Sequence, residues 1–176
     1  MPKFPIHNLK AWVAENRHLL KPPVGNKVVY QETEDFIIMV VGGPNVRTDY
    51  HYNETEEFFY MLEGNMTLRI QEEGKAVDIP IQEGEIFLLP PRVPHSPQRE
   101  ANSIGIVIER IRSKSQTDGL LWFCEKCNTS LYQEYFQMEN IMTQMQAVFE
   151  KFYRDKEACT CKSCGHVLTP PEKYRS

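Results

Sequence analysis

Seven short apolar runs, separated by turn residues, fill the chain between Lys27 and Arg112 and constrain its fold more than any other feature. Their lengths are ordinary for β-strands. From Met66 to Ile70, apolar and polar residues alternate, as in a strand with one buried face. Short strands at this regular spacing predict a mainly β fold, a sandwich or a barrel. The runs are 28–31, 36–41, 57–62, 66–71, 76–81, 85–90 and 104–111.

The regions on either side of these runs have a different character. Residues 8–20 predict a helix that Pro22 and Pro23 terminate. A polar stretch, 113–120, reads as a linker between a catalytic domain at 1–112 and a tail at 121–176. The tail carries two cysteine pairs around a second predicted helix with one apolar face, which we interpret as packing against the barrel. That face comprises Ile141, Met142, Met145, Val148, Phe149 and Phe152.

Composition excludes several classes of protein. The chain has 176 residues, 41% of them hydrophobic, and a net charge of -4, which is typical of a globular protein and not of one that binds nucleic acid or an anionic membrane. No apolar run approaches the ~18 residues of a membrane span, and the N-terminus has no signal-peptide pattern. We therefore expect a reducing, cytoplasmic location, where the five cysteines favour metal binding over disulfides.

Two histidines and a glutamate are the strongest candidates for a catalytic site. His51 precedes Glu57 by six residues, and His95 follows a later strand. Two neutral imidazoles and one carboxylate form a facial triad that leaves positions open on a non-haem iron. Zinc is an alternative on ligand grounds, but catalytic zinc usually has fewer positions. Glu57 stands beside two phenylalanines, where a carboxylate is costly to bury unless it is paired or metal-bound.

The spacing of these residues resembles the two signature motifs of the cupin superfamily. His51 and Glu57 are followed by Gly64, and the second motif runs from Gly84 through Pro90 to His95. The resemblance implies a double-stranded β-helix, or jelly-roll barrel, with the motif side chains converging inside it. Most cupins have a second histidine at the position of Asn53, so we expect three protein ligands and not four.

Longer blocks extend this likeness to one family. The segments LLKPPVGN, VGGPNVRTDYH, EEFFYMLEGN, FLLPPRVPHSPQR and VIER, together with the terminal cysteine pairs, resemble the 3-hydroxyanthranilate 3,4-dioxygenases in order and spacing. The resemblance implies an Fe(II)-dependent enzyme that opens the ring of 3-hydroxyanthranilate with O2. The product would be 2-amino-3-carboxymuconate semialdehyde, which closes to quinolinate on the kynurenine route to NAD. Family members of this length commonly form homodimers.

The resemblance also implies roles for individual residues. It assigns catalysis and substrate binding to Arg47, Glu57, Arg99 and Glu109, and oxygen binding to Arg47 and Asn26. An arginine fork suits the substrate carboxylate, and Glu109 could accept a proton. Without the family pattern, surface ion pairs would explain the arginines and Glu109 about equally well, and Asn26 would read as a turn residue.

Four cysteines of the tail form two Cys-x2-Cys knuckles, Cys124 with Cys127 and Cys161 with Cys164. Paired knuckles indicate a tetrahedral sulfur site for iron or zinc. The family resemblance implies a rubredoxin-like second metal away from the active site, and we expect a structural role. Cys159 is left as a spare thiol or a competing ligand, although knuckle spacing favours Cys161.

Two other functions remain open from the sequence. A non-catalytic cupin module would use the same pocket to bind a small acid. A cupin oxygenase or isomerase acting on a different acid is the other alternative, and a panel of substrates distinguishes it.

Overall fold

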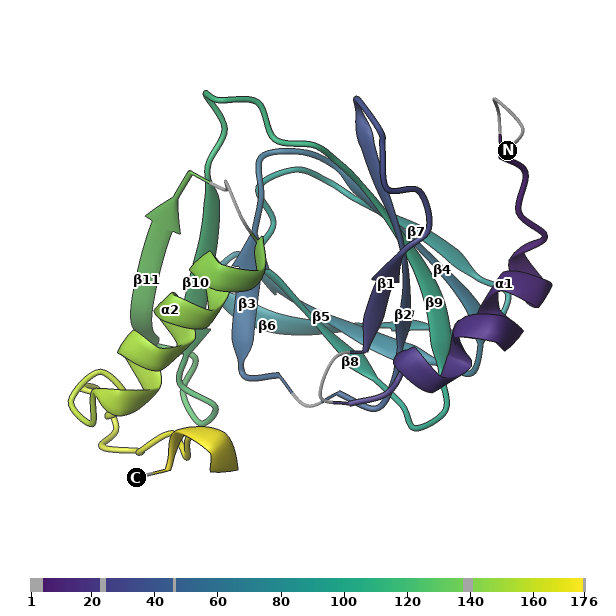
Figure 1. Cartoon of the computed structure of the whole chain (residues 1–176). Coiled ribbons are helices and arrows are strands. Elements are labelled where there is room, and N and C mark those ends of the chain that lie inside the picture. Colours follow the sequence, from purple (N-terminus) through teal and green to yellow (C-terminus); the bar gives the residue numbers. More distant parts are fainter. Residues whose placement is uncertain (1–4, 23–24, 46, 138–140, 176) are drawn as a thin grey trace.

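The computed structural model of the chain describes residues 5–22, 25–45, 47–137 and 141–175. Strands make up most of the regular structure, and the helices lie near the two ends of the chain (Figure 1). The strands are β1 (Asn26–Val28), β2 (Phe36–Gly42), β3 (Asp49–Tyr52), β4 (Glu57–Glu63), β5 (Met66–Glu72), β6 (Lys75–Ile81), β7 (Ile86–Leu89), β8 (His95–Arg99), β9 (Ile104–Arg110), β10 (Asp118–Phe123) and β11 (Ser130–Phe136). The helices are α1 (Leu9–Asn16) and α2 (Ile141–Arg154), with single 3-10 turns at Arg17–Leu19 and Glu172–Tyr174.

Two antiparallel sheets face each other and enclose the core (Figure 1). One has the strand order β1-β2-β9-β4-β7, and the other has the order β11-β10-β3-β8-β5-β6. Strands that are consecutive in the chain lie mostly in opposite sheets, except for the β1–β2, β5–β6 and β10–β11 hairpins. This confirms the predicted mainly β cupin barrel with a helix before it and a helix after it.

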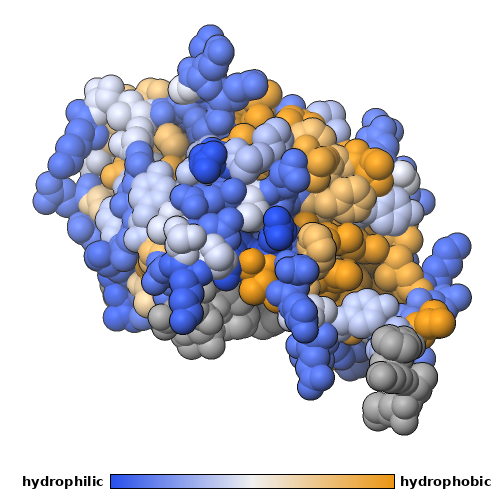
Figure 2. Space-filling view, turned by 90° about the horizontal axis from the view of Figure 1, so that it is seen from above, coloured by the Kyte–Doolittle hydropathy of each residue, from blue (hydrophilic) through white to orange (hydrophobic). Residues whose placement is uncertain are grey.

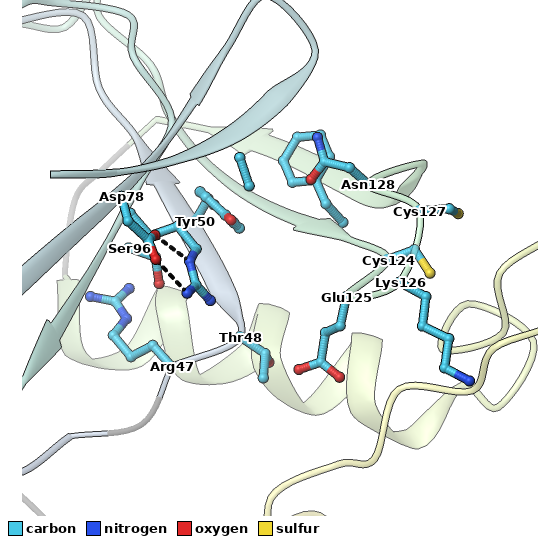
Figure 3. A pocket seen from close by; sticks show the side chains of 13 residues that line it. Arg47, Thr48, Tyr50, Asp78, Ser96, Cys124, Glu125, Lys126, Cys127 and Asn128 are labelled. Atoms are coloured by element: carbon cyan, nitrogen blue, oxygen red, sulfur yellow. Dashed lines mark hydrogen bonds and ion pairs between the residues drawn. The ribbon is translucent and has the colours of Figure 1, made fainter.

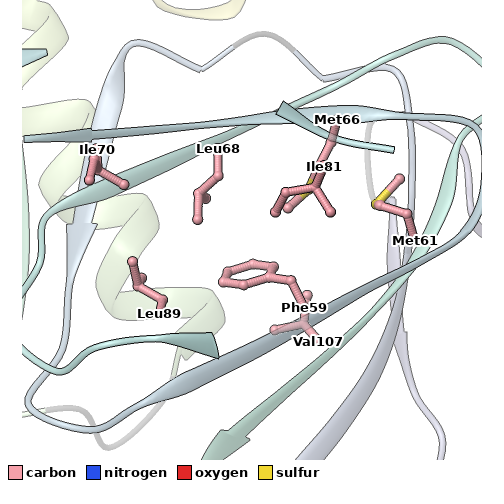
Figure 4. Close-up of a cluster of buried hydrophobic side chains, with 8 residues drawn as sticks. All are labelled: Phe59, Met61, Met66, Leu68, Ile70, Ile81, Leu89 and Val107. Carbon is pink, nitrogen blue, oxygen red and sulfur yellow. The ribbon is translucent and has the colours of Figure 1, made fainter. Parts of the chain in front are cut away.

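Apolar side chains from both sheets meet in the barrel interior (Figure 4). On β5, Met66, Leu68 and Ile70 are buried, as their alternation with polar residues predicts. They pack against Phe59 of β4 and Val107 of β9 from the opposite sheet. This packing fixes the direction in which β4 and β9 present their remaining inward side chains, Glu57 and Glu109.

Helix α1 begins where its sequence predicts. The Asn8 side chain caps it by accepting a hydrogen bond of 3.1 Å from the backbone amide of Ala11. Trp12 and Val13 are buried against the barrel. The α-helix ends at Asn16 and a 3-10 turn continues to Leu19, so helical structure stops before Pro22. Pro23, the other predicted helix breaker, lies outside the described residues.

The C-terminal region extends one of the barrel sheets. Strand β10 pairs with β3, and its first residues lie within the segment 113–120 expected to be a linker. Trp122 of β10 stacks on Phe152 of α2 with ring centroids 4.2 Å apart. Val148 and Phe152 are buried, and Met145 and Phe149 pack beside them, so α2 covers this extension. The side chains of Ile141 and Met142 lie outside the described residues.

The outer face of the five-stranded sheet is apolar. Hydrophobic surface gathers on the side of the molecule that carries this sheet (right in Figure 2). Phe36, Ile86 and Leu88 are among the exposed large side chains. In register, Leu88 lies opposite Phe58, and Phe58 lies opposite Ile108. Among the described helices, none has the length and apolar character that crossing a bilayer requires.

Candidate metal centre

Strand ends bring His51, Glu57 and His95 together at one end of the barrel. His51 and His95 are register partners on β3 and β8, and Glu57 is the first residue of β4. The loops 53–56 and 90–94 that precede β4 and β8 therefore lie at the same end. One ligand atom from each of the three residues lies within 4.8 Å of the other two, and all three residues are buried. The structure thus gathers the three residues predicted to bind iron.

The charges at this cluster suit a bound cation. The Glu57 carboxylate lies 3.1 Å from His95 Nε2 and accepts a hydrogen bond of 3.1 Å from the side chain of Asn53. Burial on its own would raise the pKa of Glu57, but His95 and His51 hold it down at about 2. The carboxylate is therefore ionised at neutral pH. Asn53, which stands where most cupins have a histidine, contacts a carboxylate in place of adding a ligand.

Hydrogen bonding at His95 supplies a direct test of whether a metal fits. Its Nδ1 lies 3.0 Å from the Val93 carbonyl oxygen, which accepts only, so Nδ1 carries a hydrogen. In the neutral ring, Nε2 then presents a lone pair to the Glu57 oxygen, another lone-pair atom, at 3.1 Å. Two such atoms require a proton or a metal ion between them. The donor set of two imidazoles and one carboxylate fits a divalent cation.

A second carboxylate, Glu109, lies beside this cluster on β9. It is buried, it is the register partner of Glu57, and its oxygen lies 2.7 Å from Nη1 of Arg112. Burial, together with the charge of Glu57, raises the pKa of Glu109. The structure therefore places Glu109 beside Glu57 and adds an ion pair with Arg112 that the sequence analysis missed.

Asp118 is the other contact that the sequence analysis missed. Its Oδ1 lies 2.7 Å from Nε2 of His51, and the Arg112 guanidinium also binds it. Burial works against the ionised form, but hydrogen bonds from His51 and Arg112 hold the pKa of Asp118 below its usual range. The one available signal was an isolated acid two residues before the apolar run 120–123.

The two predicted substrate arginines differ in their surroundings. Arg99 is buried. Among the described residues, its guanidinium contacts the sulfur of Met61, with Nη1 3.6 Å from that atom. Burial lowers the pKa of Arg99 to about 10. Arg47 is more exposed and pairs with the Asp49 carboxylate. Arg99 thus has a buried positive charge without a paired carboxylate in the described part of the chain.

Asn26 lies in a cavity between the barrel and helix α2. It is an exposed residue at the start of β1, and it lines a cavity of about 600 Å³ together with Arg47 and Asp49. Phe149 and Tyr153 of α2 form another wall of this cavity. The structure therefore brings Asn26 to the same cavity as Arg47, and the residues that line this cavity do not include His51, Glu57 or His95.

The tail forms a second candidate metal site, built from two equivalent turns. The Asn128 amide donates to the Cys124 carbonyl at 2.8 Å, and the Gly165 amide donates to the Cys161 carbonyl at 2.9 Å. The four sulfurs of Cys124, Cys127, Cys161 and Cys164 lie within 4.8 Å of one another, and all five cysteines are free. Such a set suits a closed tetrahedral site.

Cys159 stands apart from that sulfur cluster. Its thiol is buried in the apolar core between β10 and α2 and donates to the Phe152 carbonyl at 3.5 Å. Of the two alternatives open from the sequence, the geometry therefore favours a spare thiol over a competing ligand.

A groove of about 540 Å³ separates the first cysteine turn from the barrel (Figure 3). Tyr50, Asp78 and Ser96 line it on the barrel side, and Cys124 to Asn128 line it on the other. Arg47 lines both this groove and the cavity that contains Asn26. Arg47 is therefore shared by the groove and this cavity.

Comparison with one solved structure supports the fold. A protein from Neisseria meningitidis superposes with a TM-score of 0.50 at 20% identity, covering 61% of this chain and all of that one. A cupin-2 domain protein from Shewanella frigidimarina gives a TM-score of 0.49 at 20% identity, covering 60% of this chain and 95% of that one. At this level of identity, the likeness to the Neisseria protein concerns the fold alone.

Comparison of sequences is more specific. A relative from Xanthomonas oryzae pv. oryzae, named 3-hydroxyanthranilate 3,4-dioxygenase, is 59% identical over 171 residues, which are 97% of this chain and 96% of the relative. A family model described as 3-hydroxyanthranilic acid dioxygenase matches residues 1–153. These residues include the whole barrel, the His51–Glu57–His95 cluster and helix α2 up to its last residue but one. The chain therefore belongs to the 3-hydroxyanthranilic acid dioxygenase family.

Proposed function

We propose that this chain is an Fe(II)-dependent dioxygenase that converts 3-hydroxyanthranilate and O2 to 2-amino-3-carboxymuconate semialdehyde. The observation that carries the proposal is the combination of two features in one buried place. His51, Glu57 and His95 offer three metal ligands, and the guanidinium of Arg99 has no paired carboxylate among the described residues. The first feature suits a metal, and the second suits the carboxylate of an aromatic acid.

We assign the metal to Fe(II) on the chemistry of the ligands and the family. A ferrous ion held by two imidazoles and one carboxylate has open positions on one side, where a chelating substrate and O2 meet. His51, Glu57 and His95 would hold this ion. The buried surroundings exclude bulk water, which strengthens every charge interaction at the site.

Arg99 and Arg47 position the substrate in this proposal. A guanidinium can bind a carboxylate through two parallel hydrogen bonds, which fixes both the distance and the plane of the ring. The buried Arg99 is the better candidate because an incoming carboxylate would supply the missing countercharge. Arg47 is already paired with Asp49, so we assign it to the side of the site where the cavity that contains Asn26 opens.

Glu109 is the proposed proton acceptor. The pKa of Glu109 is raised, so it lies closer to neutral pH than the pKa of an exposed glutamate does. The carboxylate can therefore take a proton from the hydroxyl or amino group of the substrate. Arg112, at 2.7 Å, would hold the side chain in place while the charge changes. The reaction breaks the bond between the hydroxyl-bearing carbon and the next ring carbon, and both atoms of O2 enter the product. We propose that this product closes to quinolinate and supplies NAD synthesis.

Three further points stay predictions. The four-cysteine cluster would hold a second metal, iron or zinc, in a structural role. A cytoplasmic location remains an expectation from the sequence. So does a homodimer, for which the apolar outer face of β2, β9, β4 and β7 is the surface we expect a second copy to cover.

The test is ring opening by the purified chain. Fe(II) is added without oxygen, and air and 3-hydroxyanthranilate follow. We expect the yellow colour of the semialdehyde, with one O2 consumed per substrate. A chain with full iron content that consumes no O2 with this substrate would contradict the proposal. Related acids in a panel would then identify another oxygenase activity, and substrate binding without O2 uptake would identify a binding module.

A further inference from the structure

The hydroxyl of Tyr153 joins helix α2 to the segment of the barrel that carries Arg47. Thr48 lies close to α2 at the edge of the groove (Figure 3), and its hydroxyl is 2.6 Å from that of Tyr153. In the sequence, Thr48 stands between Arg47 and Asp49, the first residue of β3. The contact connects residues that are 105 positions apart in the chain. The proposed function gives it no role.

Trp122 fixes the position of the Tyr153 hydroxyl. The indole Nε1 lies 3.3 Å from the Tyr153 oxygen and can only donate, so that oxygen accepts its hydrogen. Trp122 is itself fully buried. The ring of Tyr153 is also buried, and it stacks on Tyr174 with ring centroids 4.9 Å apart. The hydroxyl is therefore held in one place, from which it reaches Thr48 across the boundary between the tail and the barrel.

Contacts from the barrel side hold the rest of this segment. The side-chain amide of Gln98 donates to the Arg47 carbonyl oxygen at 3.0 Å. Gln98 directly precedes the substrate arginine Arg99 on β8. The Nε of Arg47 donates to the Asp49 carboxylate at 3.1 Å. The backbone of Arg47 is thus fixed from β8 and its guanidinium by Asp49, and of these contacts only the one from Tyr153 to Thr48 comes from the tail.

Arg47 needs such contacts because it borders open space on two sides. It lines the groove beside the first cysteine turn, and it shares with Tyr153 the cavity of about 600 Å³. An arginine side chain has many rotamers, and the position of its backbone decides which region they reach. Thr48 shares a peptide bond with Arg47, so a shift of Thr48 would move that backbone. The position of the guanidinium therefore depends on the hydroxyl contact from α2.

We propose that Tyr153 is a positioning residue for Arg47, whose hydroxyl holds Thr48 so that the Arg47 guanidinium stays directed at the substrate. The proposal rests on the role that the proposed function gives to Arg47. It follows that the tail contributes a residue to substrate binding as well as a second metal site. The alternative is a hydroxyl contact that only attaches α2 to the barrel. The two differ in what happens once Arg47 is removed, because a positioning residue then has nothing left to position.

The first experiment observes the Arg47 guanidinium directly. The full chain is labelled with ¹⁵N-arginine and loaded with Zn(II), a diamagnetic probe, and the Nε–H signal of Arg47 is assigned by its absence in Arg47→Lys. Exchange of this hydrogen with solvent reports how often the contact with Asp49 opens. Tyr153→Phe keeps the buried ring and removes the hydroxyl. We expect exchange to become roughly 2- to 12-fold faster, the usual contribution of one neutral hydrogen bond.

The second experiment measures the Kd of 3-hydroxyanthranilate for the Fe(II)-loaded chain by calorimetry without oxygen. Tyr153→Phe and Thr48→Val remove the two partners of the same contact. Each should raise Kd by up to roughly 12-fold, and the double variant should show no further rise. In an Arg47→Ala background, Tyr153→Phe should leave Kd unchanged, because the effect passes through the missing guanidinium.

The matched control is Tyr132→Phe. Tyr132 belongs to the same aromatic cluster, with its ring centroid 5.9 Å from that of Trp122, but its hydroxyl donates to Glu134 on its own strand. Removing this hydroxyl should change neither the exchange of the Arg47 hydrogen nor the Kd of the substrate.

The outcomes separate this proposal from the proposed function. Wild-type exchange at Arg47 in a folded Tyr153→Phe chain would overturn the proposal. So would an equal rise in Kd with and without Arg47, which a purely structural contact would give. If Tyr153→Phe does not fold, Thr48→Val decides the question in both measurements. Faster exchange at Arg47 in a chain that neither binds 3-hydroxyanthranilate nor opens its ring would contradict the dioxygenase and leave the hold of Tyr153 on Arg47 standing.

Discussion

Glu57 and Glu109 are register partners on adjacent strands, so β4 and β9 bring two buried carboxylates side by side in the barrel. Their surroundings shift the pKa values of the two carboxyl groups in opposite directions. The two histidines hold the pKa of Glu57 at about 2 against the effect of burial, whereas burial and the charge of Glu57 raise the pKa of Glu109. Such a pair suits two roles, a permanently ionised metal ligand and a carboxylate that exchanges a proton.

Replacing Glu109 tests the second role. Glu109→Gln keeps the shape and a contact with Arg112 but cannot accept a proton. We expect kcat to fall by roughly 10²–10⁴-fold, which is the usual contribution of a general base, while bound iron per chain stays unchanged. Steady-state kinetics and metal analysis check this. Wild-type kcat in the iron-loaded variant would exclude Glu109 as the acceptor.

Arg99 should act on substrate binding. Arg99→Ala removes the buried cation, so the substrate carboxylate loses a charge-assisted contact of about 1.5–3 kcal/mol, which corresponds to a rise in Kd or KM of roughly 10- to 150-fold. Iron content should not change. Arg69→Ala, which removes an exposed arginine paired with Asp78, is the matched control. Normal substrate binding by Arg99→Ala would show that the carboxylate binds elsewhere.

Glu57 should be required for iron. Glu57→Ala removes the only anionic member of the triad, so we expect the triad metal and all turnover to be lost. The four-cysteine cluster lies in the tail and should keep its metal. Elemental analysis should therefore find one metal fewer per chain than in the wild type. Equal metal counts in the two proteins would contradict the assignment of Glu57 as a ligand.

The cysteine cluster should contribute to stability and not to chemistry. Cys124→Ser breaks a closed set of four sulfurs, and we expect Tm to fall by about 5 °C or more, because each kcal/mol shifts Tm by roughly 2–4 °C at this chain length. Turnover per iron in the folded protein should stay near wild type. Cys159→Ser, at the buried thiol outside the cluster, is the comparison for metal content. A well-folded Cys124→Ser chain without turnover would contradict the structural role.

Tyr153 should make stability sensitive to alkaline pH. Burial raises its pKa to about 12, and its hydroxyl lies 2.6 Å from the Thr48 hydroxyl. An unfolded tyrosine titrates near pH 10, so the folded state holds this proton more tightly. The associated stability is present below about pH 10 and is lost as the pH rises towards about 12. Denaturant unfolding against pH should show a smaller alkaline loss in Tyr153→Phe. Identical profiles would exclude Tyr153 as the group.

The sequence was most informative where apolar periodicity is strong. The runs at 36–41, 57–62, 66–71 and 76–81 coincide with β2, β4, β5 and β6 within one residue at each end. The run at 28–31 was shifted, because β1 ends at Val28. The knuckle spacing of the cysteines also located four sulfurs that the structure brings together. The apolar runs and the cysteine spacing each depend on residues that are close together in the chain, so they can be predicted from the sequence.

Two missed strands carry the two histidines of the triad. Strand β3 is DYHY and β8 is HSPQR, and neither has an apolar alternation. Their inward positions are occupied by His51, His95 and Arg99 in place of leucine or valine. These functional side chains stand where a strand usually has the apolar residues that make it recognisable. The spacing of the motifs therefore located the ligands, whereas apolar periodicity did not reveal the strands.

Asp118 and Arg112 could not be found in this way. They lie in or next to the polar segment 113–120, which has the composition of a linker. Only the pairing of β10 with β3 brings Asp118 to His51, which is 67 residues earlier in the chain. A contact of this kind depends on tertiary structure and has no signature in the spacing of residues.

A crystal structure of the iron-loaded chain, with anomalous difference density measured at the iron edge, tests the metal assignment most directly. We predict one peak between His51, Glu57 and His95, within bonding distance of all three side chains and with protein atoms on one side only. The assignment would be contradicted by a peak confined to the cysteine cluster. It would also be contradicted by a triad that holds no metal and whose side chains point away from each other.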